Sequence, residues 1–471
     1  MTWTEATSLR SPGFRAAVLE ALRGTEMDFT AGKLSRAVVL LAIPMVIEMM
    51  GESLFAIVDA LWVSRLGASA LAAVGLTESL LEIVYAVAVG LSMATTAMVA
   101  RRVGERNERG AAVAAVQAIA IGIGCGAVLG AAGCVAAPRL LRFMGADAEV
   151  IAAGAGYTRW MYGGMTWIML LFLNNAVFRG AGDAATAMRA LWMANATNLV
   201  LDPCFIFGLG PFPELGLTGA AVATNIGRAT GVMFQFACLL HRGRRLTVTR
   251  PDLRPNWGVV RRLLRLSVGG IGQFLIATAS YIGLIRILAS FGSDILAGYV
   301  IAIRIVIFAL LPAWGLSNAA ATLVGQNLGA RQPERAARSV WLTGLYNMIF
   351  MCGVTVVFVL FTRPVIGLFT QDPDVLPTGI EALRIVSYGY AFYAWGMVMT
   401  NAFNGAGDTF TPTAINFFCF WTFQIPLAWL LSRHTGLGPQ GVFAAIAMSY
   451  SLSAVVGIGV FRRGRWKTRQ V

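Results

Sequence analysis

The chain has 471 residues, of which 57% are hydrophobic and 13% charged, with a formal net charge of +14. Soluble domains carry about 25% charged residues, so this composition excludes a soluble globular protein. The basic residues cluster at the ends of apolar segments, which excludes a nucleic-acid partner as the reason for the positive charge.

Apolar runs long enough to cross a bilayer as helices recur along the whole chain. They predict an all-α integral membrane protein with twelve transmembrane helices. The first 36 residues contain basic side chains but no apolar core, so we expect no cleavable signal peptide. The predicted spans are 37–64, 70–98, 110–136, 154–178, 187–210, 217–241, 262–289, 295–325, 336–361, 379–403, 411–432 and 438–461.

The arginines and lysines are distributed asymmetrically between alternate loops. The loop 65–70 contains a single arginine and 208–218 contains none. Because basic loops remain in the cytoplasm, the pattern predicts a multi-pass protein of the cytoplasmic (inner) membrane with both termini cytoplasmic. Clusters of basic residues follow spans two, six, eight and twelve: Arg101, Arg102, Arg106, Arg109; Arg242, Arg244, Arg245, Arg250, Arg254; Arg331, Arg335, Arg338; Arg462, Arg463, Arg465, Lys467, Arg469.

The chain repeats itself at one constant offset. RGAGD at 179–183 returns as NGAGD at 404–408, and VGERNERGAA at 103–112 returns, displaced by the same amount, as LGARQPERAA at 328–337. Six spans return the chain to its starting side, so the halves share one orientation. We therefore predict two parallel six-helix repeats, related by an axis along the membrane normal. The predicted division is a cytoplasmic N-terminal segment 1–36, a first lobe 37–241, a cytoplasmic linker 242–261, a second lobe 262–461 and a basic tail 462–471.

Six acidic residues inside the predicted spans belong to the first half, and none of them has an acidic repeat partner in the second half. An ionised acid at mid-membrane costs roughly 2.5–3.5 kcal/mol on insertion scales, so such residues indicate function unless they form ion pairs or lie near helix ends. Arg286 and Arg304 are the candidate ion-pair partners. The acids are Glu48, Glu52, Asp59, Glu78, Glu82 and Asp202, and their repeat partners are Gln273, Ala277, Leu284, Ile303, Ile307 and Leu427.

Two of these groups have a suggestive spacing. Glu48, Glu52 and Asp59 lie within about 40° of one another on a helix. Asp202 follows Asn198 by one turn and Asn195 by two. An acid flanked by amide oxygens can hold a proton or a small cation, which makes this region a candidate for reversible ion binding.

Other chemistries are poorly supported. The two histidines, His241 and His434, lie near predicted helix ends, and the six cysteines show no CxxC spacing. No GxxxxGK[ST] motif is present. We expect neither an enzyme nor a cofactor, and no bound metal other than a coupling sodium ion.

Together, four segments resemble multidrug and toxic compound extrusion (MATE) transporters. They are IPMVIEMMGESLFAIVDALWVSRLGASALAAVGL (43–76), FRGAGD (178–183), NLVLDPCFIFG with ELGLTGAAVAT (198–224) and LVGQNLGA (323–330). The resemblance covers essentially the whole chain after residue 35. It implies two six-helix lobes around a cleft and antiport of organic cations against protons or sodium ions.

The resemblance is to the branch with its coupling site in the first lobe. It implies coupling-ion binding by Asp59, Asn198 and Asp202, and it extends to Thr224 and Tyr157. The proline that bends the first span in the family matches Pro44. Ser64 departs from the pattern, because it replaces the glycine usual before RLG.

We therefore expect a monomeric secondary antiporter that exports organic cations through the bilayer in exchange for H⁺ or Na⁺. Candidate residues for the substrate cavity are Glu48, Glu52, Glu78 and Asn195. A flippase for lipid-linked oligosaccharides is the alternative transporter, although arginines should then line the cavity. A channel or receptor without coupled transport is the alternative from another class. Carboxylate and amide oxygens suit both protons and sodium ions, so the coupling ion stays open.

The topology gives the first prediction. Cysteines introduced at Arg245 and Gly210 should be labelled from opposite faces of the membrane by an impermeant thiol reagent, in a background without native cysteines. Labelling of both positions from one face would contradict the twelve-span arrangement.

Overall fold

The computed structural model describes residues 14–24, 28–241, 246 and 248–469, and the described residues form helices joined by turns. The predicted N-terminal segment, linker and tail each contain residues outside this set. The first-half helices are α1 (Phe14–Arg23), α2 (Leu34–Ser64), α3 (Ala68–Gly104), α4 (Glu108–Phe143), α5 (Ala148–Gly163), α6 (Met165–Ala181), α7 (Ala184–Phe207) and α8 (Leu217–Leu240).

The second half begins after a short 3₁₀ turn, η1 (Arg250–Leu253). Helix α9 begins at Trp257, so residues 257–261 of the predicted linker are helical. A second 3₁₀ turn, η3 (Arg465–Thr468), lies in the tail. The second-half helices are α9 (Trp257–Ala289), α10 (Ser293–Gly329), α11 (Pro333–Leu360), α12 (Thr362–Gly367), α13 (Leu376–Ser387), α14 (Tyr390–Gly405), α15 (Phe410–Asn416), the π-helix η2 (Phe417–Gln424), α16 (Ile425–His434) and α17 (Pro439–Arg462).

These helices supply the predicted all-α membrane architecture of twelve spans in two repeats. Within the described residues, 9 helical segments are long and apolar enough to cross a membrane, and the pair α5–α6, bent by 44°, raises the number to 10. Helix α8 and the pair α13–α14 complete the twelve. Polar residues such as Asn225 and Arg228 lower the mean hydropathy of α8, and Tyr388–Gly389 divides the other span into two short helices.

The internal repeat is reproduced in detail by the backbone. The first residues of α3 and α10 are separated by the offset found in the sequence, and so are their last residues. The turns that follow these helices place Arg106 and Arg331, which are repeat partners, at φ 56° and φ 57°. A positive φ is uncommon for a residue with a side chain. Its recurrence at equivalent positions supports a shared backbone design for the two halves.

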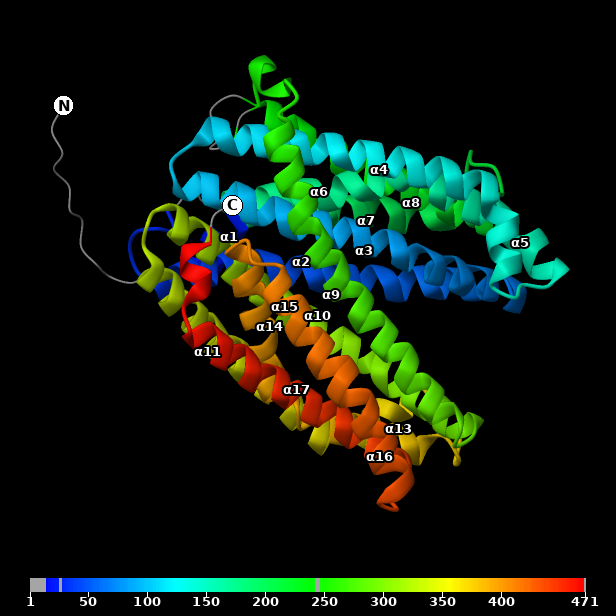
Figure 1. Cartoon of the computed structure of the whole chain (residues 1–471). Coiled ribbons are helices and arrows are strands. Elements are labelled where there is room, and N and C mark those ends of the chain that lie inside the picture. The colour runs from blue at the N-terminus through cyan, green and yellow to red at the C-terminus, as the bar shows by residue number, and fades with distance from the viewer. Residues whose placement is uncertain (1–13, 25–27, 242–245, 247, 470–471) are drawn as a thin grey trace, which may run out of the picture.

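The two halves form two helical bundles, which meet at one end and diverge toward the other (Figure 1). We call the end at which the bundles meet the terminal end, because α1 and residues 462–469 lie there. The opposite, diverging end carries α5 in the first lobe, and α13 and α16 in the second (Figure 1). Contact between the lobes is therefore concentrated near the termini.

Glycines make the close contact between the lobes possible. A Cβ built on Gly315 of α10 would lie 2.5 Å from the main-chain oxygen of Met45 in α2. A Cβ built on Gly325 would lie 2.6 Å from the Cβ of Ala100 in α3. We call this contact, which also includes Gly90 and Ile271, Gly104 and Gln326, and Gly329 and Arg101, the glycine seam.

Charged side chains reinforce the seam at the terminal end. Nε of Arg469 lies 3.3 Å from Oδ2 of Asp408, and Arg101 on α3 donates a hydrogen bond of 2.6 Å to the main-chain oxygen of Arg469. Arg335 on α11 donates to the main-chain oxygens of Ala31 and Gly32, ahead of α2. Segments from both ends of the chain therefore tie the two lobes together.

Helix α2 is central to this arrangement, because it belongs to the first lobe yet packs along α10 of the second. It is continuous from Leu34 to Ser64, with Pro44 inside it. Proline removes one intrahelical hydrogen bond, so Pro44 is a point at which this helix bends at low cost.

The seam predicts opposite effects for two matched substitutions. A Cβ at Gly329 would collide with backbone atoms of Arg101 and Glu105, whereas a Cβ at Gly124 on α4 meets no described atom within 4 Å. Gly329→Ala should therefore destabilise the protein by about 1–3 kcal/mol through overpacking. Gly124→Ala should leave stability unchanged or raise it through helix propensity. Equal thermal unfolding midpoints of the two variants in detergent would contradict the close approach at Gly329.

Candidate functional site

The site begins with α7, which carries the polar residues of the fifth span. Asp183 caps its N-terminus by accepting a hydrogen bond of 3.1 Å from the backbone N–H of Thr186. Gly208 ends the helix in the left-handed conformation at φ 69°. Between these ends, the i, i+4 spacing places Asn198 and Asp202 on one face, against α8.

Asn198 connects the two helices through its side-chain amide. Its Nδ2 donates hydrogen bonds of 3.0 Å to Oδ1 of Asp202 and 3.0 Å to Oγ1 of Thr224 on α8. Asp202 is 0% exposed. Among the described residues, neither Oδ2 of Asp202 nor Oδ1 of Asn198 has a hydrogen-bond partner. The cluster thus holds a carboxylate oxygen that can accept a proton or a cation and an amide oxygen that can coordinate a cation.

Asp59 and Tyr157 complete the group that the resemblance implied. Asp59, on α2, is close enough to Asp202 and to the buried Tyr157 on α5 for electrostatic interaction. The structure therefore brings together Asp59, Tyr157, Asn198, Asp202 and Thr224 from four helices of the first lobe.

A half-buried arginine that the sequence reasoning overlooked lies beside this group. Arg228 on α8 interacts electrostatically with Glu52 and Asp59 on α2. Its Nη2 lies 3.4 Å from the hydroxyl of Tyr85. The cost argument applied to acids inside the spans holds equally for arginine and would have identified this residue. Arg228 places a fixed positive charge next to the acids.

Asn195 joins the neighbouring part of α2. Its side chain donates a hydrogen bond of 3.3 Å to the main-chain oxygen of Gly51 and interacts with the carboxylate of Glu52. Both Glu52 and Asn195 are half-buried.

Glu78 and Glu82 lie on α3 and are exposed. Glu78 interacts electrostatically with Asp59 and with Arg304 of the second lobe. The sequence left open an ion pair with Arg304; in the described part of the chain, the structure shows an electrostatic interaction of Arg304 with Glu78 but no ion pair between the two side chains. Arg286 is exposed.

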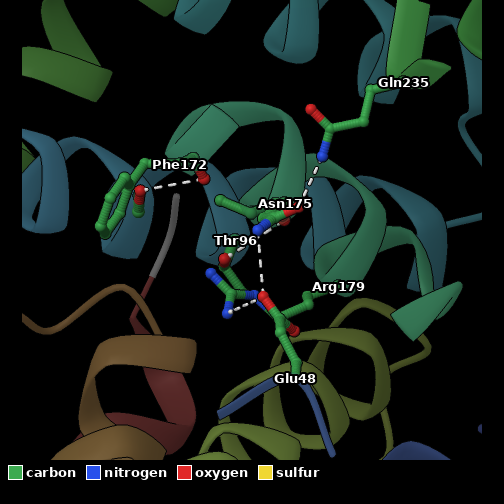
Figure 2. Close-up of polar contacts among 8 residues, drawn as sticks. Glu48, Thr96, Phe172, Asn175, Arg179 and Gln235 are labelled. Atoms are coloured by element: carbon green, nitrogen blue, oxygen red, sulfur yellow. Dashed lines mark hydrogen bonds and ion pairs between the residues drawn. The ribbon is translucent and has the colours of Figure 1, made fainter. Parts of the chain in front are cut away.

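Glu48 was predicted as a residue of the substrate cavity. Its side chain is 1% exposed and is enclosed between α2 and α6, as Figure 2 shows. Its Oε1 accepts a hydrogen bond of 3.0 Å from Asn175 and lies 3.4 Å from Nη1 of Arg179. The stripe on α2 thus turns its inner acid toward an arginine of the same lobe, and a role of Glu48 in the substrate cavity stays a prediction.

The enclosed oxygens of the site come from a carboxylate and an amide. A carboxylate can take up a proton or bind a sodium ion, and an amide oxygen can coordinate a sodium ion. Within the described residues, no group of three or more His, Cys, Asp or Glu side chains is arranged to hold a metal ion. All six cysteines lie in the described part of the chain, and each is a free thiol.

Comparisons with known proteins identify the family to which this architecture belongs. The MatE family model matches residues 44–204 and 271–430, one segment in each lobe. The chain is 25% identical over 439 residues to the probable multidrug resistance protein NorM of Thermotoga maritima, covering 93% of this chain and 94% of that protein. It is 25% identical over 441 residues to the probable multidrug resistance protein YoeA of Bacillus subtilis, covering 93% and 95%.

A solved structure shows the same fold. The crystal structure of MATE in complex with MaL6 matches with a TM-score of 0.88 at 28% identity, covering 94% of this chain and 99% of that chain. Three observations indicate the same family: the family model matches one segment in each lobe, the helices form two lobes, and the fold is like that of this solved structure. The chain belongs to the MATE family of multidrug efflux transporters and is a multi-pass membrane transporter of small molecules, not an enzyme.

Proposed function

We propose that this transporter is a secondary antiporter that exports organic cations in exchange for H⁺ or Na⁺. The observation that carries the proposal is the enclosed carboxylate of Asp202, one oxygen of which has no hydrogen-bond partner among the described residues. A permanent structural role would satisfy both oxygens, since buried polar groups in folded proteins are almost always hydrogen-bonded. An oxygen without a hydrogen-bond partner on a buried acid suits an ion that binds and dissociates reversibly.

The coupling group in this proposal is Asp59, Tyr157, Asn198, Asp202 and Thr224. Electrostatic interaction between Asp59 and Asp202 favours uptake of positive charge, because two like charges close together raise the free energy of the empty site. Asn198 fixes the orientation of Asp202 by donating to it and to Thr224. A proton or a sodium ion would relieve the repulsion without rearranging α7.

Ion binding would then act on α2, which carries Asp59 and runs along α10 of the opposite lobe. With the ion bound, the carboxylates are neutralised, and Pro44 lets α2 bend inward. With the ion released, their charges favour a straighter, wetter arrangement that attracts a cationic substrate. Glu52, Asn195 and Glu78, at or near the exposed surface, are the groups on which such a substrate would be bound.

We infer that the protein acts in the cytoplasmic membrane, with both termini and the linker 242–261 cytoplasmic, from the distribution of basic residues. We propose that it acts as a monomer. The terminal end, where the lobes meet, is then the cytoplasmic end, and the diverging end faces outward. The lobe arrangement in Figure 1 is accordingly that of an outward-facing transporter.

The alternative transporter, a flippase for lipid-linked oligosaccharides, needs positive charge for a polyanionic cargo. Arg228 and Arg304 are the nearest candidates, but Arg228 interacts with Glu52 and Asp59, and Arg304 interacts with Glu78. Because acids already compensate both arginines, the site favours cationic over anionic substrates. Counterflow of a labelled quaternary ammonium in proteoliposomes separates the exporter from both the flippase and a channel.

The two lobes should respond differently to mutation. Asp59→Asn and Asp202→Asn should each abolish gradient-driven export while the protein still inserts and folds, because each removes a charge that the coupling ion neutralises. Conservative apolar substitutions at the repeat partners Leu284 and Leu427 should have mild effects. Export by wild-type and variant proteins is measured in proteoliposomes under separately imposed proton and sodium gradients. Normal export by both acid variants would place the coupling site elsewhere.

The number of coupling ions is also testable. One ion exchanged for one monovalent cation moves no net charge, whereas two ions move one charge, worth about 2.3 kcal/mol per 100 mV. Tenfold accumulation of a neutral species costs about 1.4 kcal/mol. With Asp59 and Asp202 both taking part, a quaternary ammonium should accumulate in response to a clamped potential without any ion gradient. Absence of a response would exclude the two-ion version.

A further inference from the structure

A second enclosed charge, outside the coupling group, lies between α2 and α6. Glu48 is 1% exposed, and the side chain of Arg179, its ion-pair partner, is 13% exposed. Asn175, one turn before Arg179 on α6, donates a hydrogen bond to Glu48. Gln235 on α8 donates a hydrogen bond of 2.5 Å to Asn175 (Figure 2). The pair is thus held rigidly by three helices of the first lobe.

The second lobe contains a neutral version of this pair at the equivalent positions. Gln273 and Asn404 are the repeat partners of Glu48 and Arg179. Their amides exchange two hydrogen bonds, of 3.0 Å and 3.1 Å, and both side chains are buried. Joining the first helix of a lobe to its GAGD turn therefore requires no charge. The charge on the first-lobe pair needs another explanation.

The main chain beside Arg179 is a docking point for the opposite lobe. Thr322 on α10 donates a hydrogen bond of 3.0 Å to the main-chain oxygen of Arg179. Gln326, one turn further, donates a hydrogen bond of 3.0 Å to the main-chain oxygen of Gly180. Glu48 holds the Arg179 side chain, and thereby fixes the carbonyl groups that α10 meets at the terminal end.

The carboxylate of Glu48 is also placed to lose its charge. Its Oε2 has no hydrogen-bond partner among the described residues, so a proton can add there without breaking an existing bond. The ionisable groups that interact with Glu48 are Arg179 on α6 and Glu52 one turn along α2. Glu52 is partly exposed and lies on the same stripe as Asp59, between Glu48 and the coupling group.

We propose that Glu48 and Arg179 form a charge-dependent lock on the glycine seam. While Glu48 is ionised, the ion pair holds the Arg179–Gly180 backbone against α10 and keeps the terminal end closed. When a proton adds to Oε2 of Glu48, Arg179 keeps its charge but loses its ionic partner, and the terminal end opens. The lock rests on the proposed exchange function only in that the lobes must separate during transport.

The direction of the pH effect depends on which conformation contains the Glu48–Arg179 ion pair. The closed terminal end is stabilised while Glu48 is charged, so closure is lost as the pH falls and the carboxylate takes up a proton. For an exporter driven by protons from outside, this is the direction that returns the protein to the state open toward the termini. Glu48 is a positioning residue in this scheme, because it acts on the seam through Arg179.

Distances between spin labels test the lock without any transport measurement. One label pair, at Glu108 and Arg338, reports on the terminal end, and another, at Ala148 and Gln371, reports on the diverging end. These four positions are exposed, and the native cysteines are replaced by alanine. The wild-type background should shift toward longer terminal-end distances and shorter diverging-end distances between about pH 8 and about pH 5.

Two variants separate the charge from the packing. Glu48→Gln should favour the open terminal end at least about fivefold at the higher pH, because it removes the charge from a buried hydrogen-bonded pair. The double variant Glu48→Gln/Arg179→Asn reproduces the Gln273–Asn404 pair, so it should fold normally and lose most of the pH response. Glu381→Gln, an exposed acid on α13, is the control and should behave like wild type.

Each outcome of these distance measurements either supports or overturns the proposed lock. A double variant that keeps the full pH response would overturn the proposal, as would wild-type distance distributions for Glu48→Gln. If Glu48→Gln alone fails to fold, the double variant still decides the question. Failure of Asp202→Asn to affect export would count against the proposed coupling group but would leave the distance result intact, so the two ideas fail separately.

Discussion

The enclosure of charge within the first lobe is the constraint on which the rest of the structure depends. Asp202 is 0% exposed and Glu48 is 1% exposed, and each lies within a membrane-spanning helix. An unpaired ion at such a position costs roughly 2.5–3.5 kcal/mol even on the mildest scales. The first lobe compensates with directed groups: Asn198 donates to Asp202, and Arg179 and Asn175 surround Glu48. These partners fix how α2, α6, α7 and α8 pack against one another.

The second lobe repeats the order of the spans without that constraint. Its equivalent of Asp202 is Leu427, and its equivalent of the Glu48–Arg179 pair is an amide pair, Gln273–Asn404. In the proposed mechanism, the first lobe responds to ion binding and the second lobe does not. Because α2 of the first lobe packs along α10 of the second, a change of charge in the first lobe would then act directly on the interface.

The sequence predicted this architecture well because its signals were strong and redundant. The internal repeat anticipated the matching bounds of α3 and α10, and the spacing of Asn198 and Asp202 anticipated that they share one face of α7. Pairings between distant helices were harder to predict. The packing of α2 on α6 determines that Glu48 faces Arg179, and nothing in the local pattern around either residue encodes it. Arg228 was detectable from its position in an apolar span, but its acidic neighbours required the fold.

The central claim is that the first-lobe carboxylates exchange a coupling ion for a cationic substrate. The most direct test is to add a quaternary ammonium to purified protein in detergent, recording protons released into weakly buffered solution and, in parallel, displacement of bound radioactive sodium. The account predicts that one of the two ions leaves as the substrate binds, and that Asp202→Asn abolishes this release. Substrate binding with no release of either ion, or release that is unchanged in Asp202→Asn, would contradict it.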